Sequence, residues 1–495
     1  MRSSVPITVS NARSPIATMR SPRSNTRSEE RTDRRKPMDR RSFVKGTAAA
    51  ALMAAAPRTL FAKAGADEVA RLGTSLTPTG AIKEGSADGL IAPWAGKWNG
   101  VPTGLSFAGT GKVQPDPYAG EKPLFSITAQ NAAQYAGRLT DGQKAMFEKH
   151  PATFRMDIYP CHRDFRFSDA LHDNLKKNAL EGALTADGEG VTGVFGAPAF
   201  PFPKSGLEVI WNAISLPRAY TQRGTMDEAV VYPDGNIAWG GQQWDIYSAA
   251  YDPAVPRASF GGESAFVYRT TVKPERNRGE ITLVREFWDF GARPSQAWQY
   301  IPGTRRVKQV PEIAGDYPLG PGGFHTVDDT GLWAQSPKRY DWELVGKKEI
   351  FVPYNNFATE DPAVKYKDLL AKAHLNPQLV RWELHRAWVI RAKLKPGIRH
   401  VYSARTLYLD EDGLFPVLAD MYDARGALYR MAMQCTSFDY AGLVFQPRVT
   451  VYHDLVSGAY MADRLSNEVT DRMRYNEGGR KLDDYSPGEL KRRGV

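Results

Sequence analysis

Residues 381–437 read RWELHRAWVIRAKLKPGIRHVYSARTLYLDEDGLFPVLADMYDARGALYRMAMQCTS. Segments of about ten residues, rich in aromatic and β-branched side chains, are separated here by turn sequences. Even spacing with local turns is typical of an antiparallel meander, in which each strand pairs with the next one along the chain. We therefore expect four consecutive antiparallel strands. The turns are Lys395-Pro396-Gly397, Asp410-Glu411-Asp412-Gly413 and Asp423-Ala424-Arg425-Gly426.

The same pattern occurs earlier in the chain. Residues 263–272 and 280–288 alternate between apolar and polar side chains, with a turn sequence between them. Residues 296–301 and 305–310 form a second expected hairpin around a Pro-Gly-Thr turn. Between the two β regions, Asp361-Pro362 opens an expected helix that ends near Ala373. We therefore predict a mainly β protein of the α+β class, built on one large, curved antiparallel sheet with a few helices.

Changes in composition predict where the domain begins and ends. Thr128 and Thr140 are suitable N-caps for two short helices, and leucines about one turn apart predict a third helix over 168–184. The segment before these helices is rich in glycine and proline, and the last segment is polar. The expected organisation is a loop-rich arm at 65–125, a single domain at 126–460 and a polar tail at 461–495.

The positive charge of the chain is confined to its beginning. The 495 residues carry 65 basic and 55 acidic side chains, and residues 1–62 hold 13 of the former and 4 of the latter. The rest is therefore almost neutral, which argues against nucleic acid as a partner. No apolar run reaches the roughly 18 residues that a membrane-spanning helix needs, so we expect no transmembrane segment in the mature chain.

The beginning of the chain has the features of a twin-arginine export signal. Arg40 and Arg41 are followed by Phe43, by a modestly apolar stretch and by small residues. The alternative is an amphipathic helix within a basic tail. The signal places the mature protein in the periplasm. We expect a disordered or non-native extension at 1–37 with Met38 as the true start, a signal peptide at 38–64, and cleavage after Ala62 or Ala64.

The sequence contains two cysteines, Cys161 and Cys435. In an oxidising compartment they could form a disulfide, and the alternative is two separate buried thiols. Two cysteines do not make a zinc site unaided, and no two of the eight histidines have the i, i+4 spacing of a helical metal pair. We therefore predict neither a metal nor a cofactor.

Catalytic motifs are weak in this sequence. Gly188–Gly193 matches the dinucleotide fingerprint, but the proline-rich residues that follow it cannot open a helix. An enzyme of the hydrolase type would have to use the acidic pair Asp328 and Asp329, together with His325. The alternative for this pair is a turn with solvated carboxylates. We expect a protein without catalytic activity.

Several motifs, in this order, resemble a known bacterial family. They are residues 297–307 (AWQYIPGTRRV), 339–349 (RYDWELVGKKE), 352–356 (VPYNN), 386–389 (RAWV), 395–403 (KPGIRHVYS) and 408–412 (YLDED). Together they resemble the domain-of-unknown-function family thirteen-twenty-nine, which comprises exported proteins related to outer-membrane lipoprotein-sorting factors. The resemblance covers residues 68–460.

The resemblance implies a fold like that of the lipoprotein carriers of the Lol system. That fold is a strongly curved antiparallel sheet, an unclosed barrel, with helices on its concave side. Family members typically occur beside inner-membrane exporters of the resistance-nodulation-division type and a companion outer-membrane protein. These are therefore the partners that the resemblance implies. It transfers no catalytic residues.

Tryptophan and tyrosine are abundant on the expected strands, with 11 and 22 residues in the chain. Such rings could line a half-open barrel and hold a lipid or another hydrophobic ligand, and a pair of arginines could meet a polar head. The alternatives are an ordinary core beneath the sheet and a solvated hairpin end. The candidate ligand-binding residues are Trp298, Tyr300, Arg305, Arg306, Trp342, Tyr354, Trp388 and Tyr402.

These features together predict a non-catalytic periplasmic binding or carrier protein. Its ligand would be a lipid, a lipoprotein or another hydrophobic molecule, and it would serve an envelope export system. Two alternatives remain open. One is a hydrolase-type enzyme that uses the acidic pair, and the other is a structural adaptor between an exporter and an outer-membrane protein.

Overall fold

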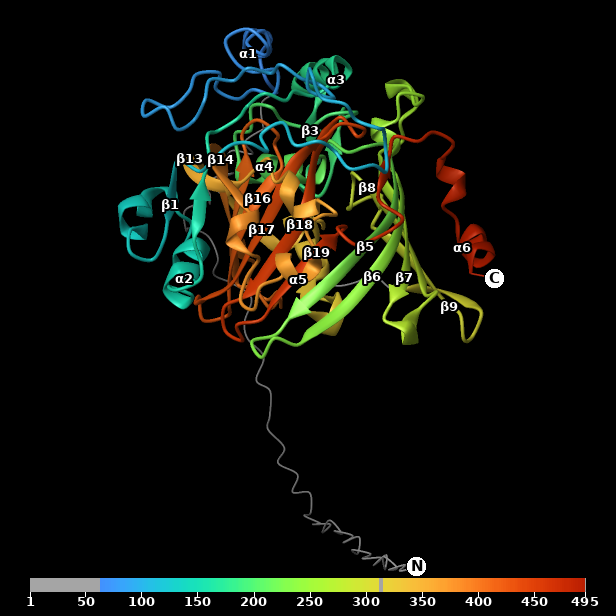
Figure 1. The fold of residues 1–495 in the computed structure, drawn as a ribbon. Helices are drawn as coiled ribbons and strands as arrows, with labels where there is room; N and C mark the ends of the chain where they lie inside the picture. Colours follow the sequence, from blue (N-terminus) through green and yellow to red (C-terminus); the bar gives the residue numbers. More distant parts are fainter. Residues whose placement is uncertain (1–62, 311–314, 495) are drawn as a thin grey trace, which may run out of the picture. The chain divides into compact units, whose positions relative to one another are not determined.

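A single sheet of 16 strands dominates the computed structural model, which describes residues 63–310 and 315–494. The export-signal residues Arg40, Arg41 and Phe43 lie outside the described residues. The predicted extension at 1–37 and residues 38–62 of the predicted signal peptide also lie outside them. Along the sheet the strands follow the order β1-β2-β14-β15-β16-β17-β18-β19-β5-β6-β7-β8-β9-β10, with β13 paired to β14 and β20 to β5 (Figure 1).

The expected meander is present. Its four strands are β14 (Arg381–Leu394), β15 (Ala404–Asp410), β16 (Pro416–Tyr422) and β17 (Leu428–Asp439), and consecutive strands pair antiparallel. The expected hairpins are β7 (Glu263–Lys273) with β8 (Ile281–Phe287) and β9 (Gln296–Ile301) with β10 (Arg306–Val310). The prediction of a large antiparallel sheet is confirmed.

The sequence did not reveal five further strands. They are β5 (Thr221–Val231), β6 (Ile237–Tyr247), β13 (Tyr340–Pro353), β18 (Val444–Asp454) and β19 (Tyr460–Leu465). Strands β18, β19, β5 and β6 join the two β regions edge to edge, and β13 pairs with β14. Strand β19 pairs with β18 on one side and with β5 on the other. At the ends of the sheet, β10 and β13 each pair with one strand among the described residues, so the sheet is not closed into a barrel.

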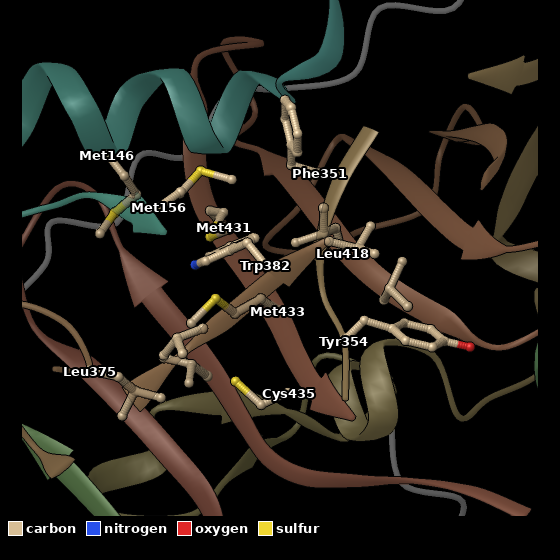
Figure 2. Close-up of a cluster of buried hydrophobic side chains, with 14 of the residues drawn as sticks. Met146, Met156, Phe351, Tyr354, Leu375, Trp382, Leu418, Met431, Met433 and Cys435 are labelled. Carbon is tan, nitrogen blue, oxygen red and sulfur yellow. The ribbon is translucent and has the colours of Figure 1, made fainter. Parts of the chain in front are cut away.

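Both faces of the meander are covered. Alternate residues of β17 point to opposite sides, because side chains of a strand alternate between faces. Met431, Met433 and Cys435 enter one apolar cluster, and Ala432 enters another. Figure 2 shows the first cluster, where helix α2 contributes Met146 above the strand. The sheet is therefore the middle layer of this part of the molecule.

The second face of the meander is the concave one. Residues of β6, β7 and β8 line the same cavity as residues of β17 and β18, although several strands separate the two groups in the sheet. The sheet must therefore curve around that face. Helix α4 (Gly206–Ile214) packs there against β13 and β14, and the short helix η6 (Val327–Leu332) packs against β16 and β17. Helices on the concave side were expected.

The other predicted helices differ in position or length. Helix α2 (Asp141–Lys149) is capped by Thr140 as expected, but it lies on the convex face, against β16 and β17. The helix expected from Asp361 to Ala373 is reduced to α5 (Tyr366–Leu369). Helix α3 (Asp169–Glu181) matches its prediction. Helix α4 was not predicted.

The last residues are part of the folded domain. Strand β19 crosses the predicted boundary at 460, and β20 (Arg474–Tyr475) adds to β5. The terminal helix α6 (Pro487–Arg493) lies beside β8, β9 and β10 (Figure 1). Tyr485 and Leu490 are buried in the apolar cluster on that face. The predicted polar tail therefore supplies core residues.

Short elements complete the chain. They are α1 (Ala66–Val69), β1 (Phe125–Ile127), η1 (Ala132–Arg138), β2 (Met156–Ile158), β3 (Ala183–Leu184), β4 (Val191–Thr192), η2 (Ala249–Tyr251), η3 (Arg257–Ser259), η4 (Glu275–Asn277), β11 (Pro318–Leu319), η5 (Pro321–Gly323), β12 (His325–Thr326), η7 (Pro337–Arg339), η8 (Phe357–Glu360), η9 (Pro377–Leu379) and η10 (Leu482–Asp484). Across the described ranges, no helix is both long and apolar enough to cross a membrane.

Candidate ligand cavity

A cavity of about 360 Å³ lies on the concave side of the sheet. This volume is within the range of small-molecule sites. Its walls come from strands β6–β9, from the end of helix α4 and from the segment 327–339. The lining is mostly apolar, and it includes Ile214, Leu216, Trp244, Ile246, Val267, Val284, Phe290, Ala297, Leu319, Val327, Trp333, Phe415 and Phe445.

Cationic groups also reach into this cavity. Arg218, Arg269 and Arg464 line it, and none of them makes a side-chain hydrogen bond or an ion pair within 4.0 Å among the described residues. The guanidinium of Arg269 lies 5.5 Å from the ring centre of Trp244. Burial lowers the pKa of Arg269, and the nearby Glu228 and Glu286 oppose this shift. The cavity therefore contains a desolvated cation without a contacting anion in the part of the chain that the structure describes.

The acidic groups of the cavity do not balance these arginines. Glu189 is paired with Lys338 at 3.0 Å, and Asp328 is paired with Arg405 at 2.6 Å. Glu286 is the one lining acid without a hydrogen bond or ion pair in the described part of the chain. Burial raises its pKa, against the pull of Arg218 and Arg269. Three arginines therefore line the cavity together with one acid that has no partner among the described residues, Glu286, and the raised pKa of Glu286 favours its neutral form.

A buried charge network holds one wall of the cavity against the sheet. Asp328 and Asp329 of η6 accept hydrogen bonds from the guanidinium of Arg405 on β15, at 2.6 and 3.1 Å. The Tyr402 hydroxyl donates to Asp329 at 2.9 Å, and His400 lies 3.0 Å from Asp328. This network joins the segment that contains Trp333 to the concave face.

The network corrects the interpretation of the acidic pair as a solvated turn, because both carboxylates are buried. Burial by itself would raise the pKa of Asp328, but Arg405 and His400 hold it at about 2. A carboxylate that stays ionised and fully hydrogen-bonded is a poor general acid or base at neutral pH. The third candidate, His325, stacks on Tyr452, and burial lowers its pKa. The geometry thus indicates a structural role for the pair.

Comparison with known proteins identifies the family. The model of a family described as "Protein of unknown function (DUF1329)" matches residues 126–491. An uncharacterized protein of Pseudomonas aeruginosa is 38% identical over 446 residues, which are 88% of this chain and 95% of that protein. This chain belongs to the DUF1329 family. The resemblance stated from the sequence motifs is confirmed.

Solved structures with a similar fold show lower similarity to this DUF1329 member. A candidate outer membrane lipoprotein-sorting protein domain from Vibrio parahaemolyticus has a TM-score of 0.39 at 14% identity, covering 58% of this chain and 98% of its own. A DUF1329 protein from Desulfovibrio piger has a TM-score of 0.38 at 12% identity, with coverages of 55% and 92%. A LolA superfamily protein from Nitrosomonas europaea has 0.34 at 13%, with coverages of 57% and 98%. These low TM-scores carry no argument about the ligand.

The residues expected to bind ligand are scattered in this DUF1329 member, and none lines the cavity. Trp298 and Tyr300 of β9 belong to the cluster on the convex face, under the C-terminal segment. Arg305 and Arg306 are exposed in the turn and at the start of β10. Tyr354 lies in the convex cluster of the meander, where Figure 2 shows it beside Leu418.

The remaining candidates lie on the concave side. Trp342 and Trp388 pack against the apolar cluster of that face. Trp342 meets Trp333, a cavity residue, at 4.8 Å between ring centres. Tyr402 is tied to the acidic pair through its hydroxyl. Trp342, Trp388 and Tyr402 therefore lie in the layer of side chains next to the cavity wall and do not line the cavity itself.

The alternation of β7 contained a signal for the cavity. Phe266 and Tyr268 face the convex cluster, so Val267 and Arg269 must face the other side. An arginine on the same face of the strand as the inward-facing Val267 is the pattern that points to Arg269. Trp333 lies in no regular strand, and no comparable pattern identifies it.

Of the two alternatives for the cysteines, the structure shows two separate thiols. Both are free and buried. Cys161 lies 3.6 Å from Nε2 of His385, whereas Cys435 lies among apolar side chains on β17 (Figure 2). Burial raises the pKa of the Cys435 thiol to about 12, which makes it unreactive. The two thiols thus have different surroundings.

Proposed function

We propose that the protein binds an amphiphile with an apolar body and an anionic head, and carries it through the periplasm. The observation that supports this is the cavity of about 360 Å³ with apolar walls and Arg269 inside it, which has no ion pair within residues 63–310 and 315–494. Apolar walls favour an acyl chain or another hydrophobic body. A buried guanidinium without a counter-ion favours a carboxylate or phosphate, because such a pair forms strong charge-assisted hydrogen bonds.

The periplasmic location is part of the proposal. It is supported by the twin-arginine pattern at Arg40 and Arg41 and by the small-residue end of that segment. We further propose that the chain serves an envelope exporter and its outer-membrane companion, as the family resemblance implies. A carrier between two membranes needs a water-shielded cavity for its ligand, and the concave face offers one.

Catalysis is not part of the proposal. The acidic pair that an enzyme would need is tied to Arg405, and it holds a cavity wall in place. No observation on the cavity favours a bond-breaking step.

Binding of laurate and of its neutral analogue dodecanol tests this function. Arg269→Met keeps an unbranched apolar stem but removes the guanidinium and its charge, so we expect it to weaken laurate binding at least tenfold and to leave dodecanol binding within about twofold. Arg306→Met is the matched control, because Arg306 is exposed on the convex hairpin and should not affect either ligand. Titration calorimetry and native mass spectrometry would measure both affinities.

Two results would contradict the proposal. If wild-type protein binds neither laurate nor dodecanol, and releases no lipid on solvent extraction from the periplasm, the carrier function is wrong. If Arg269→Met weakens both ligands equally, the cavity is used but the anionic head is not recognised by this arginine.

A further inference from the structure

A buried group of metal-ligand side chains lies outside the cavity. Cys161 precedes helix α3, and Glu383 and His385 are two residues apart on β14. Their Sγ, Oε2 and Nε2 atoms lie within 4.8 Å of one another. The exposed fractions of the three residues are 5%, 0% and 1%. None of them lines the ligand cavity, so this group is independent of the proposed function.

We propose that Cys161, Glu383 and His385 bind one zinc ion. A tetrahedral zinc with bonds of about 2.3 Å to sulfur and about 2.0–2.2 Å to nitrogen and oxygen separates sulfur from nitrogen by about 3.6 Å and nitrogen from oxygen by about 3.4 Å. The structure has Cys161 Sγ 3.6 Å from His385 Nε2, and His385 Nε2 3.1 Å from Glu383 Oε2. Two of the three distances are therefore close to those between zinc ligands, and the Cys161 Sγ and a Glu383 carboxylate oxygen lie within 4.8 Å of each other.

The donor set fits zinc by its chemistry. A thiolate, an imidazole and a carboxylate suit a borderline-soft divalent cation rather than calcium or magnesium, which prefer oxygen ligands alone. Glu383 is already paired with Arg381 at 2.6 Å, so the two positive charges of zinc would balance the Cys161 thiolate and the buried Asp410 carboxylate behind His385. Such balance matters here, because buried charges are costly unless they are paired or bound to a metal.

The surroundings supply the second layer that zinc-binding histidines need. Nδ1 of His385 lies 3.4 Å from Oδ1 of Asp410, a buried oxygen without any hydrogen bond in the described structure. A carboxylate on the far nitrogen of a histidine fixes the tautomer that leaves Nε2 free for the metal. The Tyr354 ring stacks on the imidazole at 4.0 Å and holds its plane.

A second buried oxygen without a hydrogen-bond partner among the described residues belongs to Asn355, a neighbour of Glu383. Asn355 donates from Nδ2 to Oε1 of Glu383 at 3.0 Å, and its own Oδ1 is buried without a partner among the described residues. Three protein ligands leave one tetrahedral position for water, and Asn355 Oδ1 is an acceptor for a proton of that water. The zinc would join the segment of Cys161 to β14, as Arg163 joins it to Asp412 at 2.6 Å.

Metal content of the purified full-length chain tests the site. After loading with zinc chloride and desalting, plasma mass spectrometry should find one zinc per wild-type chain and less than a tenth of that in Cys161→Ser. Cys435→Ser is the matched control, because it removes the other buried thiol, and it should keep one zinc. Circular dichroism would check that each variant is folded.

Cobalt provides a readout that needs no variant. With Co²⁺ in place of zinc, the wild type and Cys435→Ser should show the thiolate-to-cobalt charge-transfer absorption, and folded Cys161→Ser should lack it. A wild-type chain that takes up no zinc and shows no such absorption overturns the proposal, and His385 then holds a proton between its two carboxylates. Equal zinc in the wild type and Cys161→Ser also overturns it, because the metal would then bind elsewhere.

Discussion

Two regions of the sheet differ in whether their arginines have a carboxylate partner. In the meander region, β14–β18 and the segments around it, each deeply buried arginine has a carboxylate within 4.0 Å. The pairs are Arg163 with Asp412, Arg381 with Glu383, Arg405 with Asp328 and Asp329, Arg430 with Asp454, and Arg448 with Asp439. In the cavity region, the concave side of β6–β9, Arg218 and Arg269 have none among the described residues.

The acids show the same contrast. Asp328, a cavity-lining acid tied to Arg405 of the meander region, is held at a pKa of about 2 by Arg405 and His400 despite its burial. Glu228 on β5, beside the cavity region, has no contacting cation among the described residues, and its burial together with Asp463 raises its pKa to about 8. The meander region therefore supplies a partner to each of its buried arginines, as a structural core must. In the cavity region Arg218 and Arg269 have no contacting carboxylate in the described part of the chain.

Removal of the arginine that anchors the cavity wall should have the largest effect on stability. Arg405→Leu leaves Asp328 and Asp329 buried without their cation, which typically costs about 3–5 kcal/mol of unfolding free energy. Urea unfolding would measure it. Arg269→Leu is the matched control in the cavity region, and we expect a change of less than about 0.5 kcal/mol in the ligand-free protein. Equal losses in the two variants would remove the contrast between the regions.

Blocking the cavity should affect binding rather than folding. Val284 of β8 lines the cavity, so Val284→Trp fills space that the ligand needs. We expect at least a tenfold loss of laurate affinity, about 1.4 kcal/mol or more, with little change in the midpoint of urea unfolding. Lys308→Trp is the control, because Lys308 is exposed on β10 and lies outside the lining, and it should bind laurate normally. Normal binding by Val284→Trp would place the ligand elsewhere.

Much of this fold could be predicted from the sequence, because local patterns specify it. Strands β14–β17 are separated by glycine-containing turns, and β7–β10 by similar ones, so alternation and turn chemistry both mark them. Strand β18 was not predicted from the sequence, because Pro447 interrupts its pattern. The structure places this proline at a register shift opposite Thr436, where a proline is tolerated in a sheet.

The missed helix has a different cause. Helix α4, residues 206–214, reads GLEVIWNAI and is buried on nearly every side. A helix packed on all sides lacks the polar face that makes a 3.6-residue period visible. The cavity is harder to predict than the helix, because its walls come from β6–β9, α4 and 327–339. No local sequence pattern indicates that these segments meet. The candidate aromatics were therefore chosen by residue type, which does not distinguish a cavity wall from a core.

The smallest expected effect, over the single pH unit from 6 to 7, is a pH dependence that originates at Glu228 on β5, beside the cavity region. The pKa of Glu228 is raised from 4.5 unfolded to about 8 folded, so the folded state binds the extra proton between these pH values. Stability is then fully present below pH 4.5 and falls as pH rises towards 8, by up to about 1.4 kcal/mol per pH unit. Glu228→Gln should remove this slope, whereas Asp328→Asn should not, because the pKa of Asp328 is shifted downward. Urea unfolding at pH 6 and pH 7 measures the slope, and an unchanged slope in Glu228→Gln would show that Glu228 is ionised in the folded protein.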